Sequence, residues 1–236
     1  MFCRRHLFWV LNMLKFTNST VFNVDVDCIV NTINCDGFMG KGLALEFALR
    51  YPELEKRYID ECKSKMISTG RVYYYVINGQ KIINFPTKHH FKNPSQLKWI
   101  KEGLKYFVDN YGKWGIKSIA FPLLGTANGG LDRKEVEEIM IEYLSKLDID
   151  VYICYSKLLE GKEAEMVKAF TTSSIYFLSD HIKLNSKQVA AISDNLKFVK
   201  RFSDILKIEG IGRETYKKIF NFFYKQENSC EQIKLF

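Results

Sequence analysis

The chain has 236 residues, a length that fits one α/β domain with a smaller second unit, or one large α/β domain. Hydrophobic residues make up 47% of it and aromatic residues 14%, so a disordered or low-complexity chain is excluded. A net charge of +8 favours polyanionic partners, with nucleic acid first among them.

The start of the chain is expected to be an extension of unknown role over residues 1–13, because the periodic pattern begins at Leu14. The apolar run at 7–11 is too short for a signal peptide, and no segment reaches the length of a membrane span. The six cysteines form no C-x-x-C pair, and several lie in apolar runs. This pattern predicts reduced thiols in a cytoplasmic protein with no membrane partner.

Strands and helices alternate along the first two thirds of the chain. Runs of strand length are predicted at residues 14–16, 27–33, 71–77, 81–85, 117–124 and 150–155. Helical spacing predicts helices at residues 43–51, 53–64, 96–111 and 131–147. The alternation predicts a layered α/β sheet, in which ligands bind at the loops that follow the carboxyl ends of the strands. Three of these loops are unusual, at residues 34–42, 86–92 and 125–130.

Two of the unusual loops are rich in glycine and lead into helices. The first, GFMGKG, spans 37–42, and the second, GTANGG, spans 125–130. Glycine permits close backbone approach, and a helix N-terminus offers unpaired N–H groups to an anion. Each loop alone is equally consistent with a tight turn that packs a helix on the sheet. Two such loops at one sheet edge favour a bound diphosphate.

Polar residues near these loops allow further interpretations. Asn31 and Asn34 flank a strand end, where their amides could contact ribose hydroxyls or bond locally within a turn. His89 and His90 are adjacent on an extended segment, point to opposite faces, and so make a poor metal site. Lys88 could be an amine nucleophile, a charge that stabilises an anion, or a solvated side chain.

Three separated motifs, in order, resemble the macrodomain family: VNTINCDGFMGKGLALEF, INFPTKHHFKNPSQLKWIKEGL and IAFPLLGTANGGLD. The likeness is to its DNA ADP-ribosyl glycohydrolase antitoxin branch (DarG), which is related to the terminal ADP-ribose glycohydrolases. It implies a three-layer α/β/α sandwich with a mixed six-stranded sheet over residues 14–158. It also implies an enzyme that binds ADP-ribose and removes it from modified DNA bases, without a metal or cofactor.

The resemblance assigns roles by position. Lys88, in Pro-Thr-Lys, matches the lysine that this branch needs for hydrolysis, as a covalent nucleophile or through its charge. Asn34 matches the asparagine that meets the distal ribose. The full set expected to bind ADP-ribose is Thr20, Asn31, Asn34, Met39, Gly40, Lys41, Gly42, Thr87, Gly125, Thr126, Ala127, Asn128, Gly129 and Gly130.

The chain departs from the family pattern at two places. Thr20 falls near the position where many macrodomains read adenine with an aspartate, so adenine selectivity is less secure. Terminal glycohydrolases use an aspartate in the second glycine-rich loop, whereas here Asp132 follows that loop at a predicted helix start. We therefore expect Asp132 to be a helix cap. The alternatives to a DNA-directed hydrolase are a hydrolase of ADP-ribosylated protein side chains and a non-catalytic ADP-ribose reader.

Residues 159–236 contain no strand pattern and are expected to form a small helical domain. The segment FSDILKIEGIGRETYKKIF resembles a helix-hairpin-helix motif, which holds DNA through backbone N–H groups. An ordinary αα-hairpin would explain the same pattern. The residues expected to contact DNA are Gly210, Gly212, Arg213, Lys217 and Lys218. The final EQIKLF resembles peptides that dock on sliding clamps, and a cognate ADP-ribosyltransferase toxin is a further expected partner.

Overall fold

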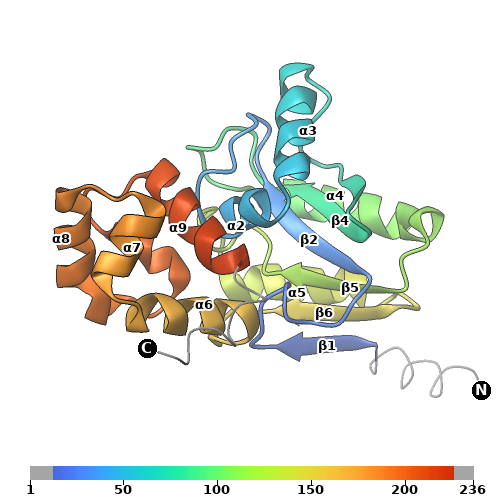
Figure 1. Cartoon of the computed structure of the whole chain (residues 1–236). Coiled ribbons are helices and arrows are strands. Elements are labelled where there is room, and N and C mark those ends of the chain that lie inside the picture. The colour runs from blue at the N-terminus through green and yellow to red at the C-terminus, as the bar shows by residue number, and fades with distance from the viewer. Residues whose placement is uncertain (1–12, 226–236) are drawn as a thin grey trace, which may run out of the picture. The chain divides into compact units, whose positions relative to one another are not determined.

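The computed structural model describes residues 13–225, which divide into two compact units between Leu158 and Leu159 (Figure 1). All strands of the described residues lie in the first unit and form one sheet of six strands. The strands are β1 (Leu14–Thr17), β2 (Cys28–Ile33), β3 (Tyr73–Ile77), β4 (Gln80–Pro86), β5 (Ser118–Pro122) and β6 (Asp150–Cys154). Their order in the sheet is β1-β6-β5-β2-β4-β3.

Five of the strands run parallel, and β3 pairs antiparallel with β4 as the second half of a hairpin. The predicted mixed six-stranded sheet is therefore confirmed. β2 and β4 lie inside the sheet and are buried along nearly all their length. Most of their residues are apolar because both faces of a parallel strand are covered, and Asn31 and Asn84 are the buried polar residues among them.

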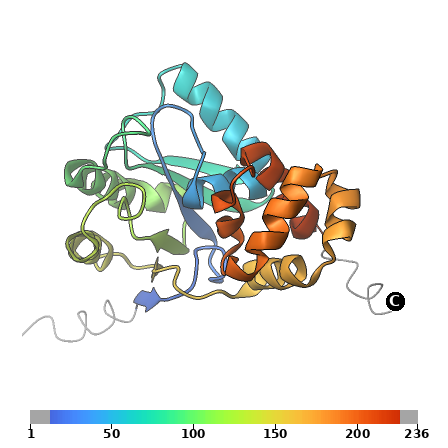
Figure 2. The ribbon, with the colours of Figure 1, turned by 90° about the vertical axis from the view of Figure 1, so that its left-hand side faces the viewer.

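Helices cover both faces of the sheet (Figure 2). The helices of this unit are α2 (Gly42–Arg50), α3 (Pro52–Lys63), α4 (Leu97–Asn110) and α5 (Arg133–Leu144), with a 3₁₀ turn η1 (Tyr111–Trp114) after α4. α4 and α5 bury Phe107 and Val136 against one face. α2 and α3 bury Phe47 and Leu54 against the other. The predicted three-layer sandwich is confirmed.

Local sequence sets where two of these helices begin. Pro52 is the first residue of α3, where its missing N–H costs nothing. α5 begins at Arg133 because the side chain of Asp132 accepts a hydrogen bond of 2.9 Å from the N–H of Glu135. The expectation that Asp132 caps a helix is confirmed.

A single carboxylate joins the amino ends of three strands. Asp27 precedes β2 and accepts hydrogen bonds from Nζ of Lys81 on β4 (2.7 Å) and from the N–H of Ser118 on β5 (3.1 Å). It also accepts from the N–H of Lys117 (3.2 Å). Partial burial raises the pKa of the Asp27 carboxyl, but these hydrogen bonds outweigh it, and the net pKa lies below the usual value.

The second unit is helical over its described residues. Its elements are α6 (Gly161–Thr172), α7 (Ile175–Ile182), α8 (Ser186–Asn195), η2 (Leu196–Phe198), η3 (Phe202–Lys207) and α9 (Arg213–Lys225). Phe170 packs edge-to-face against Phe202 and Phe223, with ring centroids 6.0 and 5.7 Å away. This aromatic contact joins α6, η3 and α9 into one small core.

Within residues 13–225, no helix combines the length and apolar character that crossing a membrane requires. The cysteines of this range, Cys28, Cys35, Cys62 and Cys154, are all free thiols. The expected extension at residues 1–13 and the clamp-like peptide at 231–236 lie outside the described residues, apart from Met13.

We predict that Asp27→Asn destabilises the protein in a pH-dependent way. Because the pKa of Asp27 is lowered on folding, its contribution is complete above the unfolded value of about 4 and is lost as pH falls through the folded value. Urea unfolding at about pH 7 should show a loss of stability that shrinks by about pH 3. The control is Asp150→Asn. Asp150 forms an exposed salt bridge with Lys15, so its loss should change stability little. An equal loss for Asp27→Asn at both pH values would contradict this account.

Candidate active site

The three unusual loops follow three neighbouring strands of the sheet. β2 lies between β5 and β4 and runs parallel to both. The connections that leave the carboxyl ends of these strands, residues 34–41, 87–96 and 123–132, therefore gather at one edge. This is the edge at which open α/β sheets bind ligands.

Asn34 shapes the first loop. Its Nδ2 donates to the carbonyl oxygen of Phe38 (2.7 Å), and its Oδ1 accepts from the N–H of Asp36 (2.9 Å). The hydroxyl of Tyr58 on α3 also donates to Oδ1 (2.8 Å). Only 7% of Asn34 is exposed. These bonds are the local turn bonding considered from the sequence, and a contact between Asn34 and a ribose stays a prediction.

Asn31 lies inside β2 and not beside its end. Its register partner in β4 is Asn84, and the Asn31 Nδ2 donates to the Asn84 Oδ1 at 2.8 Å. Both side chains are fully buried. A ligand at the sheet edge has no access to such a position, so we leave Asn31 out of the proposed site.

The two glycine-rich loops approach each other closely. A β-carbon on Gly42 would lie 2.9 Å from Nδ2 of Asn128, so a side chain there would collide with the second loop. A β-carbon on Gly129 would lie 2.2 Å from the carbonyl oxygen of Gly125. Gly42 therefore leaves room for the Asn128 side chain of the second loop, and Gly129 leaves room for a tight turn within the second loop itself.

Ser95 packs against the second glycine-rich loop, and no sequence pattern singled it out. Its N–H donates to the carbonyl oxygen of Gly129 (2.9 Å), and its side chain is 5% exposed. Its Oγ has no hydrogen-bond partner among the described residues. Ser95 follows Pro94 in what looked like an ordinary turn ahead of a helix. Only the folded chain shows that this turn packs under the second loop.

The remaining expected ligand residues occupy varied places. Met39 is 1% exposed and Thr87 4%, so these two can offer a ligand little beyond main-chain atoms. Lys41 is exposed at the start of α2. Thr20 is buried in the segment that follows β1. In the sheet, β1 is separated from β2 by β6 and β5. The second-loop residues Gly125, Thr126, Ala127, Asn128, Gly129 and Gly130 are contiguous, and the Thr126 hydroxyl donates back to the carbonyl oxygen of Leu123 (3.1 Å).

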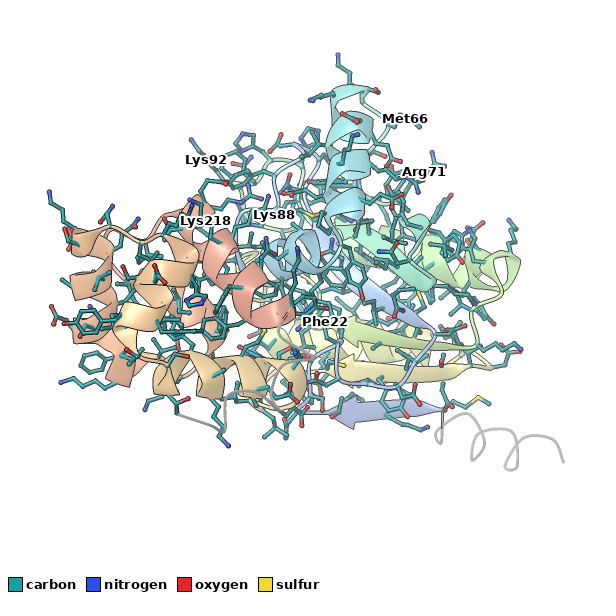
Figure 3. The ribbon with its side chains drawn as sticks, in the orientation of Figure 1. Phe22, Met66, Arg71, Lys88, Lys92 and Lys218 are labelled. Atoms are coloured by element: carbon teal, nitrogen blue, oxygen red, sulfur yellow. The ribbon has the colours of Figure 1, made fainter. Side chains whose placement is uncertain are left out.

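Lys88 belongs to the segment after β4, and its side chain reaches the second loop (Lys88 is labelled in Figure 3). Its Nζ donates a short hydrogen bond to the main-chain oxygen of Asn128 and a longer one, 3.4 Å, to that of Phe91. Among the described residues it forms no ion pair with a carboxylate. Burial lowers the pKa of the Lys88 amine. The side chain is thus a held cation with a raised share of neutral amine, suited to either chemical role.

The two histidines next to Lys88 make contacts with different neighbours. His90 stacks on the ring of Phe91, and its Nε2 lies 3.8 Å from Oδ2 of Asp36. His89 is exposed, and its carbonyl oxygen accepts from the N–H of Cys35. Across residues 13–225, no three His, Cys, Asp or Glu side chains are grouped as metal ligands.

The residues expected to contact DNA surround the start of α9 in the second unit. The segment before it is the 3₁₀ helix η3, followed by a turn through Gly210 and Gly212. Gly210 has a φ of +83°. Lys217 and Lys218 are exposed on α9, and Arg213 is its first residue. The glycine turn and the cations are therefore next to one another, as a DNA contact would require. A plain helical hairpin would place them in the same way.

Comparison with known proteins identifies close likenesses for the first unit. The sequence model of the Macro domain family matches residues 30–140. The DNA ADP-ribosyl glycohydrolase of Mycobacterium tuberculosis is 38% identical over 160 residues, which cover 64% of this chain and 46% of that protein. The solved macrodomain of Mycobacterium tuberculosis DarG matches with a TM-score of 0.59 and 37% identity, covering 60% of this chain and 97% of that one.

A second relative comes from Thermosipho africanus. Its DNA ADP-ribosyl transferase-DNA ADP-ribosyl glycohydrolase fusion protein is 35% identical over 159 residues, which cover 59% of this chain and 41% of that protein. The solved structure of Thermosipho africanus DarTG in complex with ADP-ribose matches with a TM-score of 0.59 and 36% identity, over 61% of this chain and 42% of that one. The matched region spans less than half of both curated relatives.

The burial of Lys88 predicts unusual reactivity of its amine. Burial lowers the pKa of Lys88, whereas hydrogen bonding to Asp109 raises the pKa of Lys105. An amine-selective reagent should therefore modify Lys88 at a lower pH than Lys105. The measurement is the extent of acetylation at each lysine by peptide mass spectrometry across a pH series. Lys105 is the internal control. If Lys88 reacts only at the pH where Lys105 does, its amine is not perturbed as described.

Proposed function

The chain belongs to the macrodomain family, and from that premise we propose that it is a hydrolase that removes ADP-ribose from modified DNA bases. The observation that carries the proposal is that Lys88, in the segment after β4, donates hydrogen bonds through Nζ to the main chain of Asn128 in the second glycine-rich loop and of Phe91. The relatives that match this unit at 35–38% identity bear the name DNA ADP-ribosyl glycohydrolase. Because the chain spans less than half of those proteins, the activity itself is a proposal.

ADP-ribose would lie across the two glycine-rich loops, with its diphosphate against main-chain N–H groups. α2 has no side-chain hydrogen bond at its N-cap residue, Lys41, and no acidic residue in its first turn. A helix start of this kind favours an anion. The unpartnered Oγ of Ser95 beside Gly129 provides a further polar group under the second loop.

Lys88 would act on the bond between the distal ribose and the base. As a neutral amine it would attack the anomeric carbon, the glycosidic bond would break, and the base would leave with its electron pair. Water would then release the ribose from the amine. As an ammonium it would instead stabilise negative charge on the departing base while water attacks. Both routes pass through an oxocarbenium-like transition state. The hydrogen bonds to two carbonyl oxygens fit either role.

The main alternative is a hydrolase of ADP-ribosylated protein side chains, and a second is a reader that binds ADP-ribose without cleavage. The net charge of +8 and the names of the relatives favour DNA. Each alternative corresponds to a different outcome of the experiment on Lys88.

We predict that Lys88→Ala lowers the rate of ADP-ribose release from modified single-stranded DNA by about 100-fold or more, the loss expected when a transition-state contact is removed. Affinity for free ADP-ribose, measured by calorimetry, should change little, because the loops provide most of the contacts. Lys101→Ala on α4 is the matched control, since Lys101 is an exposed lysine of the same unit.

The same assay separates the alternatives. If ADP-ribose is released from an ester-linked ADP-ribosyl protein but not from DNA, the protein is a hydrolase of modified protein side chains. If it binds ADP-ribose but releases it from neither substrate, it is a non-catalytic ADP-ribose reader. Undiminished release by Lys88→Ala would remove Lys88 from the mechanism.

We also propose that the second unit holds DNA near the glycine turn at 210–212. The exposed Lys217 and Lys218 and the adjacent Arg213 support this, because cations beside a helix start are suited to a phosphate.

Replacing Arg213, Lys217 and Lys218 with Ala should weaken binding of unmodified single-stranded DNA. The slope of log affinity against log salt should fall by about 2, as three lost phosphate contacts predict. The control replaces Lys98, Lys101 and Lys105 of α4 with Ala. If both triple variants lose the same affinity, the second unit has no special role.

A cognate ADP-ribosyltransferase is the protein partner that we propose. In the Thermosipho africanus relative, transferase and glycohydrolase are named as parts of one fusion protein, which supports a functional link between the two activities. The sliding-clamp partner rests on residues 231–236 alone and stays a prediction.

A further inference from the structure

Three aromatic side chains form a cluster beside Lys88, which we call the aromatic platform: Phe38, His90 and Phe91. Phe38 is 42% exposed and Phe91 37% exposed. Their ring centroids are 4.9 Å apart, and His90 stacks on Phe91 at 4.7 Å with an interplanar angle of 25°. Large aromatic rings left open to solvent cost hydrophobic free energy, so a cluster of them points to a binding surface.

The platform is held in place by the loops it belongs to. Asn34 bonds the main chain of Phe38 through both its amide oxygen and its amide nitrogen. Asp36 accepts a hydrogen bond of 2.7 Å from the N–H of Phe91. A β-carbon on Gly40 would lie 2.2 Å from the ring of Phe38, so that ring rests directly on the first glycine-rich loop. The rings are thus fixed before a ligand arrives.

Lys88 lies between this platform and the second glycine-rich loop. Its Nζ donates to the carbonyl oxygen of Phe91 on one side and to that of Asn128 on the other. If ADP-ribose occupies the glycine-rich loops and its anomeric carbon lies at Lys88, the group attached to that carbon must extend toward Phe91. The platform is therefore on the side of the leaving group.

The chemistry of the platform fits a nucleobase. A base has a flat π-face that stacks on aromatic rings, whereas an aliphatic carboxylate side chain has none. Lys92 Nζ lies 5.6 Å from the ring centroid of Phe91 and adds a positive charge, which suits a DNA phosphate, beside the platform (Lys92 is labelled in Figure 3). The carboxylate of Asp36 already accepts a hydrogen bond from the N–H of Phe91.

We propose that the aromatic platform stacks the nucleobase that carries ADP-ribose and so selects DNA over modified protein side chains. The proposal rests on the proposed function for the identity of the bound sugar nucleotide.

The experiment compares two affinities in the Lys88→Ala background, where the substrate is not turned over. The probes are a fluorescent single-stranded oligonucleotide with ADP-ribose on one base, and free ADP-ribose. Phe38→Ala and Phe91→Ala should each weaken binding of the modified oligonucleotide by about tenfold, the effect of losing one stacked ring. Phe91 lies outside the two glycine-rich loops, so Phe91→Ala should leave ADP-ribose affinity unchanged. Phe16→Ala on β1 is the control, because Phe16 is also an exposed phenylalanine, at 47%.

Two substitutions separate stacking from packing. Phe91→Trp keeps a π-face and should retain affinity, whereas Phe91→Leu keeps apolar volume and should lose it. Affinities for the modified oligonucleotide equal to wild type in both alanine variants would overturn the proposal, as would equal loss of ADP-ribose and oligonucleotide binding in Phe91→Ala. This experiment measures binding and not hydrolysis. If the platform variants lose affinity for the modified oligonucleotide but the wild-type protein does not hydrolyse it, the proposed function is refuted and this inference stands.

Discussion

The position of β2 between β5 and β4 is the constraint on which the site depends. Because all three strands are parallel, their carboxyl ends meet at one edge, and the loops after them become neighbours. Loops separated by many residues in the sequence are thus brought within bonding distance. The buried amide pair of Asn31 and Asn84 lies between β2 and β4, and Asp27 joins the amino ends of the same strands. These contacts fix the register of β2 against β4 and with it the positions of the loops that follow both strands.

Close packing of the glycine-rich loops is the second feature on which the site depends. Gly42 leaves room for the Asn128 side chain of the second loop, and Gly125 and Gly129 let that loop pack closely on Ser95. A surface made from main-chain N–H and carbonyl groups suits a diphosphate and ribose better than a charged side chain, because its polar groups are fixed by the fold. Lys88 is the exception, a long cation placed where this main-chain surface ends.

The sandwich, the sheet composition and the capping role of Asp132 were predictable, because apolar periodicity and local hydrogen bonding determine them. The family resemblance rested on short motifs and is confirmed by the macrodomain match. Three features could not be predicted. Asn31 lies inside a strand, where its Nδ2 donates to Oδ1 of Asn84 while its own Oδ1 has no partner among the described residues. Ser95 and the Phe38–Phe91 contact join residues far apart in sequence, and no periodic pattern reports such contacts. The roles of the site residues stay predictions.

Lys88 is held by carbonyl oxygens, which bear only partial charge, and burial already weakens its hold on a proton. If ADP-ribose binds these loops as proposed, its diphosphate brings full negative charge beside the amine and raises the pKa of the amine again. An ammonium role would gain from this change, whereas a neutral amine nucleophile would act against it. Under the proposed function, the acid–base behaviour of Lys88 therefore differs between the empty and the loaded protein.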